Sequence, residues 1–110
     1  MRDWPAEIKV GALKYTPMIV CQIDDNDSLA GSIDHTQCII EVVANASREA
    51  MAATLWHEVV HAILTQCGFT EGHIYESAVQ ALGYHLPQFI VENHDLVEWT
   101  KKMILELTNE

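Results

Sequence analysis

The stretch "TLWHEVVHAI", residues 54–63, places two histidines four residues apart with a glutamate between them. On an α-helix, residues four apart lie one above the other, so His57 and His61 could present two imidazole nitrogens to one metal ion. Glu58 lies about 100° around the helix from His57, where its carboxylate could reach water beside the ion without binding the ion itself. This spacing is typical of a hydrolytic zinc centre, in which the ion makes water acidic and the carboxylate accepts the proton.

The residues around the motif favour a metal site over two incidental structural histidines, which is the alternative interpretation. The neighbours are apolar: Leu55, Trp56, Val59, Val60, Ala62 and Ile63. Imidazoles and a carboxylate are costly to bury among such side chains unless they are paired or bound to a metal. We therefore predict Zn2+ as the cofactor, His57 and His61 as its ligands and Glu58 as the catalytic base.

A catalytic zinc needs a third protein ligand and an open position. In the HExxHxxGxxH pattern, a glycine turns the chain so that a third histidine returns to the metal. This chain has Leu64 and Cys67 at those two positions, so the helix should continue. Peptide deformylases instead use a cysteine in an upstream EGCLS stretch, which the "TQCII" around Cys38 does not resemble. The third ligand should therefore come from the segment after the motif.

Helix geometry favours Glu76 as this third ligand. If the next helix runs antiparallel, the chain descends about 9 Å from His61 to Cys67 and climbs about 6 Å from Gly72 to Glu76. Glu76 is then roughly level with His61. His73 and Glu71 remain alternatives, and Gln80 is level with the site but is a weaker ligand.

Two segments before the motif are rich in strand-forming residues. Residues 8–20 suggest one or two edge-type strand pieces, interrupted by Gly11 and Pro17. The turn-forming run "DDNDSLAGS" then leads to residues 33–42, which suggest a second strand. A hairpin or small antiparallel sheet is expected here.

Three helices are expected after the strands. Residues 47–67 contain no glycine or proline, with Ser47 as N-cap and Gly68 just beyond the end. A second helix begins near His73, and Pro87 should kink or restart it. A third runs from about Asp95 to Leu107, with its apolar face more typical of core packing than of a partner surface. The predicted fold class is α+β, with a small antiparallel N-terminal sheet packed on three helices and the HExxH helix central.

Composition limits the functional classes. The chain has 110 residues, 16 acidic against 6 basic, and a net charge of −10, so we expect a single domain spanning residues 1–110 that does not bind nucleic acid. No uncharged apolar run approaches the roughly 18 residues needed to span a membrane. The N-terminus does not resemble a secretory signal, and three unpaired cysteines suit a reducing compartment. We expect a cytoplasmic protein; the sequence does not indicate its oligomeric state.

The segment "TLWHEVVHAIL", followed by "ESAVQALGYHL", resembles small phage- and prophage-encoded zincin-like metallopeptidases, broadly akin to the ImmA/IrrE group. The resemblance covers about residues 29–99 and includes "LAGSIDHTQCIIEV", which looks like the strand before the active-site helix. It implies a minimal zincin-like fold, zinc held by His57, His61 and Glu76, catalysis by Glu58, and a gluzincin-like metalloendopeptidase acting on a protein or peptide in the bacterial host cytoplasm. Pro87 departs from the family pattern.

A second interpretation is a catalytically silent zinc-binding domain that acts as a protein-interaction or regulatory factor of a phage or mobile element. Glu58 favours the enzyme, because a structural zinc needs no base beside it. Tyr75, Tyr84 and His85 could each donate a hydrogen bond to the oxyanion of a reacting peptide. The strand at residues 32–40 could bind an extended peptide along its free edge.

Overall fold

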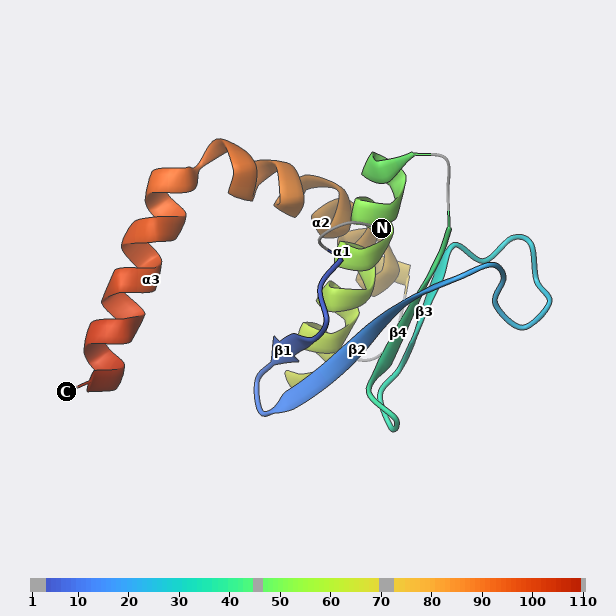
Figure 1. Ribbon diagram of the computed structural model, residues 1–110, viewed down its shortest axis with the longest axis horizontal. Coiled ribbons are helices and arrows are strands. Elements are labelled where there is room, and N and C mark those ends of the chain that lie inside the picture. The colour runs from blue at the N-terminus through green and yellow to red at the C-terminus, as the bar shows by residue number, and fades with distance from the viewer. Residues whose placement is uncertain (1–3, 45–46, 70–72, 110) are drawn as a thin grey trace.

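The computed structural model describes residues 4–44, 47–69 and 73–109 and has an α+β fold (Figure 1). One sheet contains β1 (Ile8–Val10), β2 (Leu13–Val20), β3 (Gly31–Asp34) and β4 (Ile39–Val43). The helices are α1 (Arg48–Gln66), α2 (His73–Glu92) and α3 (His94–Asn109). The predicted fold class and the central position of the HExxH helix, α1, are confirmed.

The sheet is mixed, so the expectation of a wholly antiparallel sheet is wrong for one pair. The strand order is β1-β2-β4-β3; the two outer pairs are antiparallel, but β2 and β4 are parallel. The loop 21–30 carries the chain from the end of β2 to the far edge of the sheet, where β3 begins. β4 then returns between β3 and β2, in the same direction as β2. This topology leaves β3 as the edge strand nearest the motif.

Pro17 lies within β2 without interrupting it. The backbone amide of Thr16 donates a hydrogen bond to the carbonyl of Cys38, on the β4 side. Because successive backbone amides of a strand point to opposite sides, the nitrogen of Pro17, which has no hydrogen, points away from β4. On that side of β2, β1 pairs only with residues 13–15 and does not extend as far as Pro17. A proline is tolerated where no ladder hydrogen bond is required.

The stretch 33–42, expected as one strand, forms parts of two strands joined by a tight turn. Oδ1 of Asp34 accepts hydrogen bonds from the amides of Thr36 and Gln37, both at 2.9 Å. Cys38 closes the turn with a φ of 57°, a left-handed conformation. An aspartate that bonds to the amides following it is a common turn former.

The core lies between one face of the sheet and α1. The largest fully buried side chains on the sheet are Tyr15, Ile40 and Val42, and they pack with Met51 and Ala62 of α1. Figure 1 shows α1 lying along the sheet, with α2 against a different face of α1. α1 is therefore fixed from two directions.

α2 packs along α1 in the antiparallel sense and continues as one helix through Pro87, which was expected to kink or restart it. α3 makes its main contact with α2 and stands apart from the sheet (Figure 1). The expectation that its apolar face packs into the core is therefore wrong. The exposed fractions of four of its apolar side chains are 49–59%: Leu96, Trp99, Ile104 and Leu105. In the described part of the chain, no helix is both long and apolar enough to cross a membrane.

Candidate metal centre

α1 places His57 and His61 on one face, as the spacing predicts. Its N-terminus is capped by Ser47, whose hydroxyl accepts a hydrogen bond from the amide of Ala50 at 3.1 Å. The helix then runs unbroken past the motif to Gln66, and Gly68 follows with a φ of 91°. The Nε2 atoms of the two histidines are 3.1 Å apart. A regular helix thus provides both imidazoles without any local distortion.

α2 brings Glu76 to the two histidines. Its Oε1 lies 3.1 Å from Nε2 of His57 and 3.3 Å from Nε2 of His61. Among the described residues, these three side chains form the cluster of potential ligands, from histidine, cysteine, aspartate and glutamate, that could hold a metal ion. Glu76 is half exposed, at 58%, whereas the histidine side chains are only 23% and 16% exposed. The site therefore opens to solvent on the glutamate side.

The close approach of α2 depends on Gly83. A Cβ atom at this position would lie 2.8 Å from Cα of His57 and 2.9 Å from its backbone nitrogen, closer than such atoms can come. Val79, one turn earlier, is fully buried. The missing side chain of Gly83 lets α2 lie near enough to α1 for a glutamate side chain to reach the histidines.

The triangle of ligand atoms has the size that a tetrahedral zinc ion requires. In a tetrahedron, the edge between two ligand atoms is about 1.63 times the metal–ligand bond. Edges of 3.1–3.3 Å therefore correspond to bonds of about 1.9–2.0 Å, close to the zinc distances of about 2.0–2.2 Å for imidazole nitrogen and carboxylate oxygen. The three residues fit the ion and leave a fourth position open.

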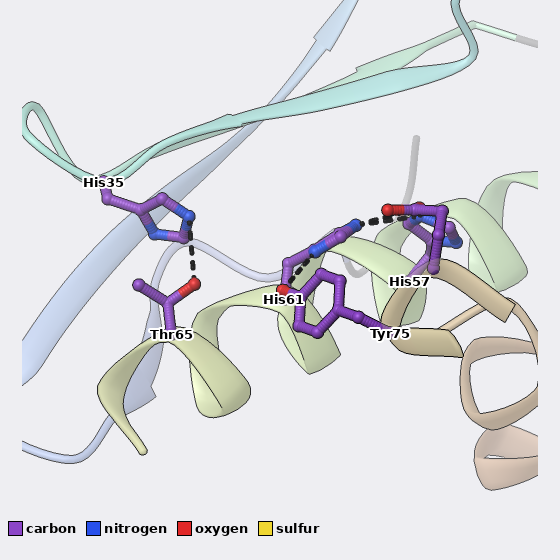
Figure 2. A network of polar contacts seen from close by, with 6 residues as sticks. His35, His57, His61, Thr65 and Tyr75 are labelled. Carbon is purple, nitrogen blue, oxygen red and sulfur yellow. Dashed lines mark hydrogen bonds and ion pairs between the residues drawn. The ribbon is translucent and has the colours of Figure 1, made fainter. Parts of the chain in front are cut away.

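Tyr75 fixes the orientation of His61. Its hydroxyl lies 2.7 Å from Nδ1 of His61, so the opposite nitrogen, Nε2, points toward His57 and Glu76 (Figure 2). Burial lowers the pKa of His61, and this effect exceeds the opposing attraction of Glu76. A neutral imidazole with Nδ1 hydrogen-bonded leaves the lone pair of Nε2 free to bind a metal.

Glu58 lies next to His57 in the sequence and is buried. Among the described residues, it is the charged residue whose side chain is buried. It is only 5% exposed, and its Oε2 has no hydrogen-bond partner among the described residues. Burial raises its pKa to about 7, and the nearby carboxylate of Glu76 contributes to the rise. An orphaned carboxylate with such a pKa can both accept and return a proton near neutral pH.

The edge strand β3 covers Glu58. A Cβ on Gly31 would lie 2.5 Å from Cγ2 of Thr54 and 3.5 Å from Cγ of Glu58, so the missing side chain lets the strand rest on α1. A cavity of about 360 Å3 remains beside this contact. It is lined by Ala30, Gly31, Ala50, Ala53, Thr54, His57, Glu58, Gln80 and Tyr84. Glu58 and His57 therefore both face a space that a ligand could enter.

Some of the other predicted candidates lie at the cavity, as Gln80 does, and others in the described residues lie away from it. Cys38 is in the β3–β4 turn, with its thiol 3.7 Å from the carbonyl of His35, and is not part of the metal group. Glu71 and the side chain of His73 lie outside the described residues. His85 is exposed and contacts the ring of Tyr84. Of the proposed oxyanion donors, Tyr84 lines the cavity, while the hydroxyl of Tyr75 is engaged with His61.

Two features of the site were missed from the sequence. The role of Tyr75 as a partner of His61 had only a weak signal, its position next to Glu76. Nδ1 of His35 forms a hydrogen bond with the hydroxyl of buried Tyr15 at 3.1 Å. Figure 2 shows the other side of the ring, where Nε2 of His35 lies 3.5 Å from the hydroxyl of Thr65 on α1. It ties the β3–β4 turn to the helix one turn beyond His61, and its polar sequence context gave no indication of this.

Comparison of this chain with protein-family models, curated proteins and solved structures finds no match.

Proposed function

We propose that this protein is a zinc-dependent metallopeptidase in which His57, His61 and Glu76 hold the ion and Glu58 is the general base. The observation that carries the proposal is the Glu58 carboxylate, buried next to the ligands, with one oxygen unpartnered and a cavity in front of it. Keeping a carboxylate in such surroundings costs stability. A structural zinc site has no use for that carboxylate, whereas a hydrolytic site requires it.

The donor set supports zinc over other ions. Two imidazoles and one carboxylate, with a fourth position open, are the ligands of many hydrolytic zinc sites. Magnesium and calcium prefer sites built wholly from oxygen atoms. The distances of 3.1–3.3 Å between ligand atoms also suit the short bonds of a tetrahedral ion.

A zinc ion at these residues would supply the positive charge that acidifies water and polarises the peptide carbonyl. Glu58 removes a proton from the water as its oxygen attacks the carbonyl carbon. The same carboxyl group then returns the proton to the peptide nitrogen as the C–N bond breaks, so that a carboxylate and an amine leave the site. Tyr84 lines the cavity and is the remaining candidate to stabilise the carbonyl oxygen.

The test combines metal content with cleavage of a general peptide library. Purified protein should contain about one zinc per chain, and Glu58→Gln should retain the metal while losing cleavage. A native protein that binds no zinc at micromolar concentrations would overturn the proposal.

The exposed apolar residues of α3 favour a second candidate function, in which the zinc-binding domain binds a protein partner without turnover. In that case the wild-type protein would hold zinc but cleave no peptide in the library. Wild-type activity that Glu58→Gln abolishes would exclude this alternative.

A further inference from the structure

A groove leads away from Glu58 along the N-terminal half of α1. The cavity at the metal centre adjoins a second hollow of about 530 Å3 between α1 and the C-terminal half of α2. The two share Ala50, Ala53 and Tyr84 as lining residues. The two hollows are therefore neighbours, and we call them together the α1–α2 groove, which begins at Glu58 and ends near Glu49 and Glu92.

The walls of the groove change in character along its length. Near Glu58 several lining residues, including Gly31, Ala53 and Thr54, are small and leave room for a short uncharged side chain. Farther along, Ala52 and Val91 keep the floor and wall apolar. A bulky side chain next to Glu58 would collide with the residues that line this end, and a carboxylate there would face the carboxyl group of Glu58.

The far end of the groove is acidic. Both charged residues that line the second hollow are glutamates, Glu49 and Glu92, and no lysine or arginine lines it. Oε2 of Glu49 accepts a hydrogen bond from the hydroxyl of Ser47 at 3.0 Å, and Oε1 of Glu92 accepts one from the side-chain Nε2 of Gln88 at 2.7 Å. Hydrogen bonds from its own backbone amide and from Ser47 lower the pKa of Glu49, which is therefore ionised at neutral pH. These oriented carboxylates are complementary to a cationic side chain.

An independent feature points to a ligand in this groove. Glu58, which lines the inner end, is 5% exposed and has an oxygen without a hydrogen-bond partner among the described residues. Burying such an atom unsatisfied is unfavourable, and a polar group of an occupant that reaches the Glu58 carboxyl would relieve it.

We propose that the α1–α2 groove binds an extended peptide with a short uncharged side chain next to the reacting bond and a lysine or arginine over Glu49 and Glu92. This deepens the proposed peptidase function and rests on it. The eight helical steps from Glu49 to His57 span about 12 Å. At about 3.3 Å per residue, the basic side chain is three or four residues from the reacting bond.

The first experiment measures binding, so it does not depend on turnover. Zinc-loaded Glu58→Gln protein is titrated by NMR with two acetylated octapeptides of alanine and serine that differ only in carrying lysine or norleucine at the fourth position. The lysine peptide should bind about threefold to tenfold more tightly at low ionic strength, with shifts at Ala50, Ala53 and Val91, and salt should reduce the difference. Equal affinity of the two peptides would overturn the proposal.

Paired charge variants locate the effect. Glu49→Gln with Glu92→Gln should remove the lysine preference, whereas Glu98→Gln with Glu106→Gln, which changes the net charge equally on α3, should preserve it. The same loss in both pairs would show a general effect of net charge and would overturn the groove assignment.

A cleavage profile separates this proposal from the peptidase function. Wild-type protein should cleave library peptides with lysine or arginine enriched three or four residues from the cut, and the Glu49/Glu92 pair should lose that enrichment. Cleavage without enrichment overturns the groove proposal alone. Absence of cleavage overturns the peptidase function, while the NMR titration still decides whether the groove selects basic peptides.

Discussion

Gly83 of α2 lies directly against the backbone of His57, with room for a hydrogen atom but not for a methyl group: an added Cβ would be 2.8 Å from Cα of His57. The two helices that supply the three candidate ligands therefore touch at one of these residues, His57. The position of Glu76 relative to the histidines depends on this contact, because Glu76 lies two turns earlier on the same helix.

Gly83→Ala should push α2 away from α1 and weaken zinc binding. The added methyl group meets helix backbone, which cannot move aside as a flexible side chain would. We expect zinc affinity to fall about tenfold or more and the free energy of unfolding to fall by about 1–3 kcal/mol. Chelator competition and urea denaturation measure the two effects. Ala81→Ser, at an exposed position of α2, is the control and should change neither.

Tyr75→Phe should weaken zinc binding while leaving the fold intact. The phenol hydroxyl holds Nδ1 of His61, and its loss frees the imidazole to change tautomer and rotate. Zinc affinity should fall about 10-fold to 100-fold, and 15N NMR of the metal-free protein should show a mixture of His61 tautomers. Tyr84→Phe removes a hydroxyl near the site without touching a ligand and should retain full affinity. Equal affinities of wild type and Tyr75→Phe would refute the role of Tyr75.

Glu76→Ala should weaken zinc binding more than any change at Cys38. It removes one of the three ligands, so affinity should fall by about 100-fold or more. Cys38→Ala should leave the affinity unchanged, since Cys38 lies in the β3–β4 turn outside the metal group. Chelator competition on both variants gives the comparison, and a larger loss from Cys38→Ala would mean that the third ligand is misassigned.

The metal-free protein should lose stability as the pH rises, because of Glu58. Its pKa in the folded protein is raised from 4.5 to about 7, so the folded state holds this proton more tightly than the unfolded chain does. The resulting stability is fully present below about pH 4.5 and is lost as the pH rises through 7, a change of about 3 kcal/mol.

Glu58→Gln should remove this pH dependence. With a chelator present, the variant should be more stable than wild type at pH 8.5 and similar to it near pH 4.5, as measured by urea denaturation. If the wild-type protein instead gained stability relative to the variant as the pH rose from 4.5 to 8.5, the raised pKa of Glu58 would be contradicted.

Much of the geometry of the candidate site could be predicted because it depends on helix geometry. The four-residue spacing of His57 and His61 fixes their shared face, and a constant rise per residue brings Glu76 level with them on an antiparallel neighbour. The distances of 3.1–3.3 Å between their ligand atoms agree with that prediction. Local rules were sufficient here because only a short connection separates the two helices.

Features that depend on contacts between distant segments were not predicted. The parallel pairing of β2 with β4 follows from the path of the loop 21–30, which strand propensity does not encode. The burial of Glu58 depends on Gly31 lying over it, and these residues are far apart in the chain. The exposure of α3 has the same origin: its apolar pattern predicted burial, but no element of the described fold covers that face.

Pro87 lies four residues after Gly83 in α2, and this spacing has a mechanical consequence. Proline has no amide hydrogen, so the carbonyl of Gly83 loses its usual helical partner, and Gly83 itself is the least stiff residue of the helix. α2 therefore bends most easily between these two residues. The N-terminal part of α2 carries Glu76 and is packed against α1. The C-terminal part carries Val91 and Glu92 and connects to α3. Bending at this point would change the width of the α1–α2 groove while leaving the spacing of His57, His61 and Glu76 unchanged.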